Sequence, residues 1–303
     1  MAVTAAMVKE LRERTGAGMM DCKNVLLETD GDTERAIEVL REKGLAKAAK
    51  KAGRVASEGL VRITFSQGNR AAAIAEVNSE TDFVAKNEDF IGFVESVAQL
   101  AVETKWNNLE EFLALPQDQA TLRDKLNGLI ATIGENLNIR RVRKLERPGT
   151  VYVGYTHGGG KIGVVIGLET EASHEEVAVA GKDVAMQVAS MNPKFIDESQ
   201  VDPDYIESEK KILVQQALNE GKSADIVEKM VVGRLKKELK ETCLLEQKFV
   251  KNPDVTVAQY LKEAAEALKK PLKVVEMVRY EVGEGIEKKE ENFAEEVAKQ
   301  IGG

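Results

Sequence analysis

Histidine and cysteine are almost absent from this sequence of 303 residues, which contains two of each. The only histidines are His157 and His174, which are too few for most zinc sites. This scarcity also argues against a Ser–His or Cys–His nucleophile pair. Cys22 and Cys243 are far apart and in no paired spacing, which argues against a disulfide framework or a thiolate metal site and indicates a reducing environment. We therefore expect a protein that is not an enzyme and that needs no metal and no cofactor.

The sequence also lacks a long apolar run and an excess of basic residues. No stretch approaches the ~18 apolar residues that a membrane helix needs, and Met1–Thr4 lacks the basic and apolar regions of a signal peptide. The formal net charge is −8, whereas a nucleic-acid surface requires a basic face. We expect a cytoplasmic protein, or one whose targeting segment has been removed, that binds neither membranes nor nucleic acid directly.

Aromatic residues make up only 5% of the chain, which otherwise has the 43% hydrophobic and 31% charged residues of a globular protein. The length predicts two or more domains. Residues 45–58 are rich in alanine and lysine and are typical of a helical, solvated connector. A nucleic-acid arm is the alternative for this segment, although no aromatic residues interleave with its basic ones.

The N-terminal residues are typical of three short helices. Thr4 can cap the first helix, and the second begins near Met20, after a pair of glycines. Asp32 can cap the third helix, for which Gly44 is the expected stop. We predict a small helical bundle with its linker over residues 1–55.

The rest of the chain contains one pattern twice: two strands joined by a turn, then two helices, then a third strand. In the second occurrence the last helix and strand follow only after an interruption. Each three-stranded sheet can bury one face under its own helices, so we predict an α+β fold with two related three-stranded antiparallel core subdomains. The elements are expected at 60–65, 71–77, 88–103, 120–137 and 140–145, and again at 151–156, 162–168, 175–191, 257–268 and 272–282.

The interruption, residues 195–241, is typical of two helices joined by a turn. An antiparallel helical hairpin (a coiled coil) offers an apolar seam, which often binds a partner. This seam can make a homodimer with a second copy, or it can pack back on its own domain. The predicted domains are 1–55 (bundle and linker), 56–146 (first core subdomain), 147–194 with 242–284 (second core subdomain), 195–241 (inserted hairpin) and 285–303 (C-terminal helical module).

A glycine-rich stretch, residues 157–161, superficially resembles a phosphate-binding loop. Its glycine spacing does not fit that motif, Ile162 follows the lysine, and the stretch lies between two strands rather than between a strand and a helix. A hairpin turn that requires positive φ explains the glycines better. We expect His157 to be exposed at the tip of this turn, where it can contact a partner.

The sequence Thr81-Asp82-Phe83-Val84 follows a predicted strand and precedes a predicted helix, so it should lie in an exposed loop. In one interpretation Thr81 or Asp82 caps the helix and Phe83 packs inward. In the other, Phe83 is an exposed aromatic wedge with a charged neighbour. Met19 and Met20 form a second apolar knob, suited to recognising a helix.

Four stretches together carry a resemblance that covers essentially the whole chain. With them, the sequence closely resembles the bacterial translation elongation factor Ts family in its long form, which has two similar core subdomains and a helical-hairpin insertion. The stretches are Glu10–Lys23 (ELRERTGAGMMDCK), Glu76-Val77 with Thr81–Lys86 (TDFVAK), Ile133–Arg141 (IGENLNIRR) and Glu281–Lys288 (EVGEGIEK).

The resemblance implies a guanine-nucleotide exchange factor that binds elongation factor Tu–GDP and promotes GDP release during translation elongation. In such proteins the Thr-Asp-Phe-Val loop enters the GTPase domain near its magnesium and phosphate site. Phe83 would wedge between helices of elongation factor Tu, and Asp82 would help displace groups that hold the ion. Thr81 and Val84 would shape the loop.

The resemblance also implies further contacts with elongation factor Tu. The N-terminal bundle is similar to ubiquitin-associated domains, and Arg12, Met19 and Met20 would dock on a helix of the GTPase domain. His157 would reach another domain, and a last helix after Gly285 would add a further contact. The alternative is a helix-binding adaptor with a ubiquitin-associated-like domain and no exchange activity.

Overall fold

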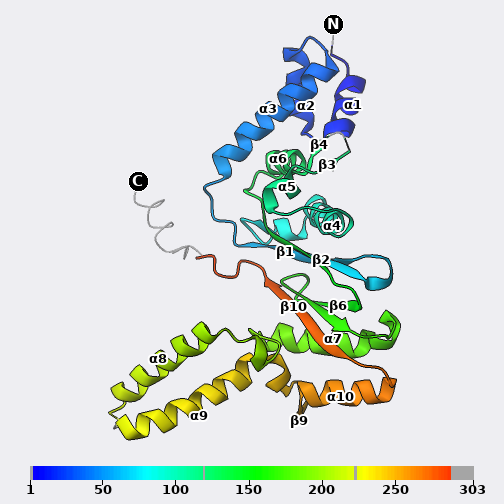
Figure 1. The fold of residues 1–303 in the computed structure, drawn as a ribbon. Helices are drawn as coiled ribbons and strands as arrows, with labels where there is room; N and C mark the ends of the chain where they lie inside the picture. Colours follow the sequence, from blue (N-terminus) through cyan, green and yellow to red (C-terminus); the bar gives the residue numbers. More distant parts are fainter. Residues whose placement is uncertain (1–2, 119, 222–223, 288–303) are drawn as a thin grey trace. The chain divides into compact units, whose positions relative to one another are not determined.

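The computed structural model describes residues 3–118, 120–221 and 224–287, without the side chains of 224–226 and 228 (Figure 1). The chain forms two compact units. Unit 1 comprises the chain up to Arg62, Ala75–Arg143 and the chain from Glu281 onward; unit 2 comprises Ile63–Ile74 and Lys144–Tyr280. The mixture of helices and sheets confirms the α+β class, whereas the finer division into five domains stays a prediction.

Unit 1 begins with three helices, α1 (Ala5–Thr15), α2 (Met19–Glu28) and α3 (Thr33–Lys51). As expected, Thr4 and Asp32 cap α1 and α3 by accepting backbone N–H groups. The buried core of this bundle consists of Val8, Leu11, Cys22, Val25, Leu26, Ala36 and Val39.

The expectation that Gly44 ends the third helix is wrong, because α3 continues through it to Lys51. Gly44 is buried, and a Cβ placed on it would lie 3.9 Å from the backbone oxygen of Asn127 in α6 (Leu122–Ile133). The glycine therefore serves the contact between α3 and α6. Its neighbours along the chain are good helix formers and carry the helix past it.

The sheet of the first core has the strand order β1-β2-β5, with β1 at Glu58–Phe65, β2 at Ala71–Ser79 and β5 at Asn138–Glu146. Helix α4 (Glu88–Glu103) has the predicted bounds. Helix α6 is shorter than the predicted 120–137, because Gly134 adopts a left-handed conformation (φ 89°) that ends it. The short elements are η1 (Gln67–Asn69), η2 (Val84–Lys86), α5 (Leu109–Leu113), β3 (Pro116–Gln117) and β4 (Ala120–Thr121).

Unit 2 contains a sheet with the order β10-β7-β6, in which β6 (Thr150–His157) pairs antiparallel with β7 (Ile162–Glu169). Strand β10 is Lys273–Glu281. The buried core joins this sheet to α7 (His174–Met191) and α10 (Val257–Leu268). Three short elements precede α10, namely η4 (Leu244–Glu246), β8 (Lys248–Phe249) and β9 (Asn252–Thr256).

The two sheets have the same connectivity, since in each the third strand lies beside the second strand of the opening hairpin. The second helices match closely as well. Both α6 and α10 follow a two-stranded ladder, begin with a capping box on a threonine and end at a left-handed residue. The two ladders, β3–β4 and β8–β9, were not among the elements predicted from the sequence.

The interruption contains η3 (Glu198–Gln200) and two long helices, α8 (Pro203–Asn219) and α9 (Ala224–Thr242), which lie side by side in Figure 1. Their shared seam buries Leu213, Ala217, Val227 and Val231. Backbone hydrogen bonds join the entry of the hairpin to its exit, from Leu244 N–H to the Phe195 carbonyl oxygen (2.9 Å) and from Lys194 N–H to the Thr242 carbonyl oxygen (2.8 Å). The hairpin therefore leaves and re-enters unit 2 at one place.

None of the helices within the described ranges combines the length and apolar character needed to cross a membrane. The C-terminal helix expected within 285–303 falls, beyond residue 287, outside the residues that the structure describes.

Candidate protein-binding site

The Phe83 loop, residues 80–87 between β2 and α4, presents a large aromatic side chain to solvent. The Phe83 side chain is 78% exposed, whereas the next two residues, Val84 and Ala85, are buried. Helix α4 is capped by Asn87, whose side chain accepts the Phe90 N–H at 3.1 Å. The interpretation of this segment as a helix cap with Phe83 packed inward is therefore wrong.

The base of the loop is held by a carboxylate from another segment of unit 1. Glu135 accepts the Thr81 backbone N–H at 3.0 Å and the Thr81 hydroxyl at 2.7 Å. On the other side, the Ser79 hydroxyl donates to the Thr81 carbonyl oxygen at 2.9 Å. Thr81 thus uses its backbone N–H, carbonyl and side chain to fasten the loop.

Next to Phe83, the loop carries a pair of opposite charges. The Lys86 ammonium lies 2.9 Å from the Asp82 carboxylate and 5.7 Å from the centroid of the Phe83 ring. Both charged side chains are half exposed or more. An exposed ion pair of this kind contributes little to stability, so the contact between Lys86 and Asp82 can open at small cost.

A protruding aromatic side chain on a fastened base is the geometry of an interface anchor. Such residues carry most of the energy at protein interfaces when they enter a pocket on the partner. Burying a phenylalanine side chain contributes about 1.5–3 kcal/mol. The loop is therefore suited to insertion into a partner, and none of its side chains needs to perform chemistry.

The second core has a different segment in the corresponding place. Residues 170–173 connect β7 directly to α7, where Ser173 is the N-cap. Ala172 is fully buried, and its N–H donates to the Thr170 hydroxyl at 3.1 Å. This connection is shorter than residues 80–87 and has no counterpart of η2, so only the first core presents an exposed aromatic here.

The N-terminal bundle exposes the other residues singled out in unit 1. Met19 and Met20 lie in the first turn of α2 and are 54% and 63% exposed. Arg12, in the last turn of α1, is exposed, and its guanidinium makes no hydrogen bond or ion pair with any residue that the structure describes. Two exposed apolar side chains and an exposed guanidinium are suited to contact with a helix.

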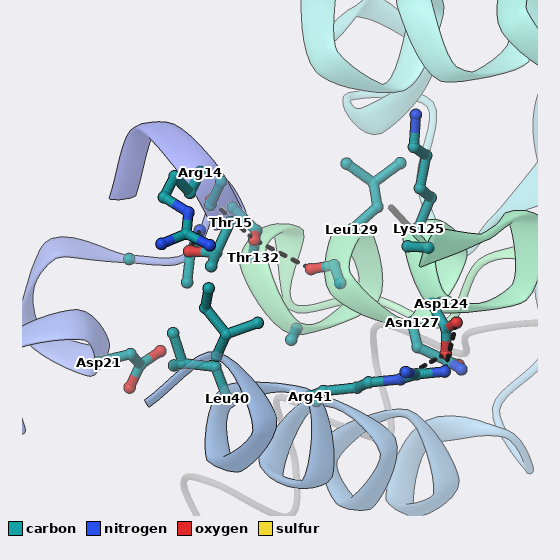
Figure 2. A pocket seen from close by; sticks show the side chains of 18 of the residues that line it. Arg14, Thr15, Asp21, Leu40, Arg41, Asp124, Lys125, Asn127, Leu129 and Thr132 are labelled. Atoms are coloured by element: carbon teal, nitrogen blue, oxygen red, sulfur yellow. Dashed lines mark hydrogen bonds and ion pairs between the residues drawn. The ribbon is translucent and has the colours of Figure 1, made fainter. Parts of the chain in front are cut away.

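A groove lies between this bundle and α6, and Arg12 is among its lining residues. Figure 2 shows Arg41 of α3 reaching Asp124 of α6 across the groove, with a bidentate contact of 2.6 and 3.0 Å. This contact holds the bundle against the first core, because a bidentate arginine–carboxylate pair restricts orientation as well as distance.

His157 is the last residue of β6 and is exposed, as expected for the tip of a hairpin. The three glycines that follow it all have positive φ (59°, 66° and 105°), which confirms the hairpin turn. The His157 Nδ1 is hydrogen-bonded to the Tyr155 hydroxyl at 2.9 Å. His157 belongs to unit 2, whereas Arg12, Met19, Met20 and the Phe83 loop belong to unit 1.

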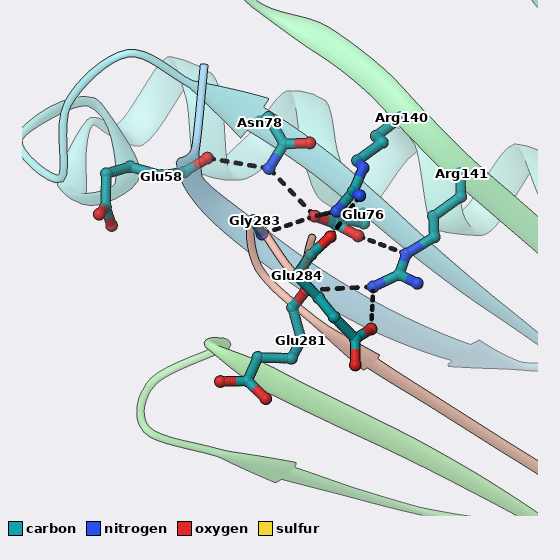
Figure 3. Close-up of polar contacts among 8 residues, drawn as sticks. All are labelled: Glu58, Glu76, Asn78, Arg140, Arg141, Glu281, Gly283 and Glu284. Atoms are coloured by element: carbon teal, nitrogen blue, oxygen red, sulfur yellow. Dashed lines mark hydrogen bonds and ion pairs between the residues drawn. The ribbon is translucent and has the colours of Figure 1, made fainter. Parts of the chain in front are cut away.

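A buried cluster around Glu76 lies at the end of β2 (Figure 3). Glu76 is fully buried, and its carboxylate accepts hydrogen bonds from Asn78 (3.0 Å), Arg140 (3.1 Å), Arg141 and the Gly283 N–H (2.9 Å). Burial alone raises the pKa of Glu76, but these hydrogen bonds and the charge of Arg141 outweigh it and hold the pKa below its ordinary value.

The same cluster fixes the chain after β10. Arg141 also binds the Glu281 carbonyl oxygen (3.1 Å) and the Glu284 carboxylate (3.0 Å). Gly283 has a φ of 73°, and a Cβ placed on it would lie 2.2 Å from the Ser57 carbonyl oxygen. The close approach therefore requires glycine at this position.

Neither Glu76 nor Glu135 was among the functional residues expected from the sequence. Both lie within stretches that carry the family resemblance, which was the available signal. Apart from Asn78, their partners are 54 to 207 residues away along the chain, so only the tertiary structure identifies them. Among the described residues, no group of three or more His, Cys, Asp or Glu side chains is arranged to hold a metal ion.

Comparison with known proteins places these features in a family. The family model for "Elongation factor TS" matches residues 80–284. The chain is 59% identical to an elongation factor Ts from Clostridioides difficile (strain 630) over 300 residues, covering 99% of both chains. It is 53% identical to one from Clostridium botulinum (strain Alaska E43 / Type E3) over 301 residues, again covering 99% of both. The chain therefore belongs to the elongation factor Ts family.

Proposed function

We propose that this protein is a guanine-nucleotide exchange factor of the cytoplasm. It binds elongation factor Tu–GDP, disturbs the magnesium and phosphate site of that GTPase and promotes GDP release during translation elongation. It acts by protein contact and not as an enzyme. The observation that carries the proposal, together with family membership, is the 78% exposure of Phe83 on a loop fastened at Thr81.

The physical basis is linkage between two ligands of one GTPase. Magnesium bridges the protein and the nucleotide phosphates, so its loss removes charge neutralisation from GDP. If the bound factor weakens GDP binding, GDP must weaken the factor by an equal amount. Each ~1.4 kcal/mol of this coupling lowers nucleotide affinity tenfold. No residue of this chain needs to bind GDP or magnesium itself.

In this proposal Phe83 inserts between helices of elongation factor Tu, and Asp82 competes for groups that hold the ion. Thr81 and Val84 shape the loop, Thr81 through its hydrogen bonds and Val84 through its buried side chain. The ubiquitin-associated-like bundle docks on the GTPase domain through Arg12, Met19 and Met20, which are exposed. His157 contacts another domain from the tip of the β6–β7 hairpin.

The decisive test is release of fluorescently labelled GDP from elongation factor Tu, followed by stopped flow. We expect wild-type protein to accelerate release and Phe83→Ala to lose most of this acceleration. Because Phe83 is largely exposed, its replacement should change thermal stability little. Val179→Ala is the matched control, since Val179 is an apolar side chain of α7 that is 72% exposed.

Two results would contradict the proposal. If Phe83→Ala loses thermal stability and exchange activity in parallel, the residue acts through folding. If wild-type protein binds elongation factor Tu without accelerating release, the helix-binding adaptor is the better description.

Polar replacements of Met19 and Met20 should weaken association in calorimetry while leaving the core folded, and unchanged affinity would remove the bundle from the interface.

A homodimer through residues 195–241 is a separate proposal. Its support is the exposure of Ile212, Leu218 and Val232 on α8 and α9, at 47%, 47% and 63%. Exposed apolar side chains on neighbouring helices can form an interface with a second copy. Light scattering across a concentration series measures the mass directly, and a constant monomer mass would refute it.

A further inference from the structure

We propose that Glu135 is a positioning residue for exchange, which sets the direction in which Phe83 points. The inference rests on the proposed function and deepens it. Glu135 does not need to touch the partner, because its carboxylate acts on Thr81, two residues before Phe83.

The contact is reciprocal between two loops of unit 1. Glu135, in the loop after α6, accepts the backbone N–H of Thr81 at 3.0 Å. Glu80, in the Phe83 loop, accepts the backbone N–H of Asn136 at 2.5 Å. Each loop therefore supplies one carboxylate and one backbone donor to the other. Two such contacts in opposite directions restrict sliding and rotation far more than one contact would.

The loop that carries Glu135 is itself held from behind. The Asn136 side chain donates to the Arg54 carbonyl oxygen at 2.7 Å, and the Lys51 ammonium donates to the Gly134 carbonyl oxygen. Gly134 ends α6 in a left-handed conformation, which directs the next residue out of the helix. Glu135 thus projects from a supported base and not from a free loop.

Phe83 consequently has an anchor on each side along the chain. Before it, Thr81 is fastened by Glu135 and by the Ser79 hydroxyl. After it, Val84 is buried and begins η2. A side chain between two anchors meets the partner in one orientation, so little freedom is lost on insertion. Releasing the first anchor keeps Phe83 exposed but lets its direction vary.

A graded series of variants tests this. Glu135→Ala removes both hydrogen bonds to Thr81, whereas Glu135→Gln keeps one acceptor oxygen and can satisfy only one of the two donors well. We expect the limiting rate of labelled GDP release at saturating factor to fall about tenfold for Glu135→Ala and less for Glu135→Gln. The factor concentration for half-maximal rate should change less, because most of the contact surface is intact.

The matched control is Glu111→Ala. Glu111 also lies in unit 1 and also accepts a backbone N–H and a side-chain N–H, both from Asn107, at 2.9 and 2.8 Å. It fastens the start of α5 instead of the Phe83 loop. Its replacement reports the general cost of removing such a contact from unit 1, and we expect the limiting rate to stay near that of wild type.

The double variant Phe83→Ala/Glu135→Ala separates positioning from folding. If Glu135 acts through Phe83, its replacement should cause no further loss once Phe83 is gone. A merely structural role predicts additive losses and a matching drop in thermal stability. If Glu135→Ala does not fold, two milder variants decide whether Glu135 positions Phe83 or only stabilises the fold. These are Glu135→Gln and Thr81→Val, the second of which removes only the hydroxyl donor.

The outcomes distinguish this inference from the proposed function. Normal release with Phe83→Ala overturns the role of the loop as a whole. Slow release with Phe83→Ala, combined with wild-type rates for Glu135→Ala, overturns only the positioning role. A tenfold loss for Glu135→Ala, absent in Glu111→Ala and absent in the Phe83→Ala background, supports it.

Discussion

Replacing Glu76 by glutamine should destabilise unit 1 by about 3 kcal/mol at neutral pH. Removing one partner of a buried ion pair typically costs about 3–5 kcal/mol, because the remaining charge is left uncompensated. The lower end applies here, since the Arg140 and Arg141 side chains are 26% and 28% exposed and can recover some hydration. Glutamine keeps the volume of Glu76 but turns an N–H group toward donors that need an acceptor.

The single tryptophan of the chain provides the measurement. Trp106 lies in unit 1 with its ring centroid 5.0 Å from that of Phe112, so its fluorescence follows the unfolding of this unit. With a slope of about 2 kcal/mol per molar urea, the expected loss lowers the unfolding midpoint by about 1.5 M. The control is Glu110→Gln, which removes an exposed ion pair with Arg123 and should cost less than about 0.5 kcal/mol.

The difference between wild type and the Glu76 variant should also depend on pH. The pKa of Glu76 in the folded protein is lowered, so its charge contributes stability above the ordinary glutamate pKa of about 4.3. That contribution is lost as the pH falls through the lower, folded-state pKa. The two midpoints should therefore converge in acid. A midpoint shift no larger than that of Glu110→Gln at pH 7, or a shift that persists undiminished in strong acid, would refute the reasoning.

Two further predictions use pairs of glycines that differ in one respect. Gly283→Ala and Gly285→Ala both place a side chain at positive φ (73° and 74°), but only the first meets a backbone atom, at 2.2 Å. Urea unfolding should show a loss of about 1 kcal/mol for Gly285→Ala and a clearly larger one for Gly283→Ala; equal losses would remove the steric argument. In helices, Gly181→Ala meets Val153 at 2.6 Å and should destabilise by about 1–3 kcal/mol. A Cβ placed on Gly92 has no atom within 4 Å, so Gly92→Ala should stabilise the protein by about 0.5–1 kcal/mol. Thermal unfolding followed by circular dichroism measures both helix variants.

Much of the secondary structure followed from local signals. Helices α4 and α10 have the predicted bounds, 88–103 and 257–268, because each combines an apolar face at helical spacing with a capping residue directly before it. The interrupted second pattern was visible for the same reason. The family resemblance was visible too, because it rests on residue identities and not on their arrangement.

Other features depended on contacts that no local pattern contains. Gly44 has the composition of a helix end, yet its place against α6 keeps it inside α3. The ladders β3–β4 and β8–β9 are too short to show strand alternation. The direction of Phe83 could not be settled by sequence, since either orientation suits a loop before a helix.

The sequence by itself determined which residues could act: an aromatic next to a carboxylate in a loop, an exposed histidine at a hairpin tip and two methionines after a glycine turn. The tertiary structure decided which of them are available and what holds them. Phe83 faces solvent because Asn87 caps α4 and Val84 occupies the buried position of the loop. Glu135 and Glu76 have roles because folding brings them to donors distant in sequence, and only among such donors does burying the Glu76 carboxylate become favourable.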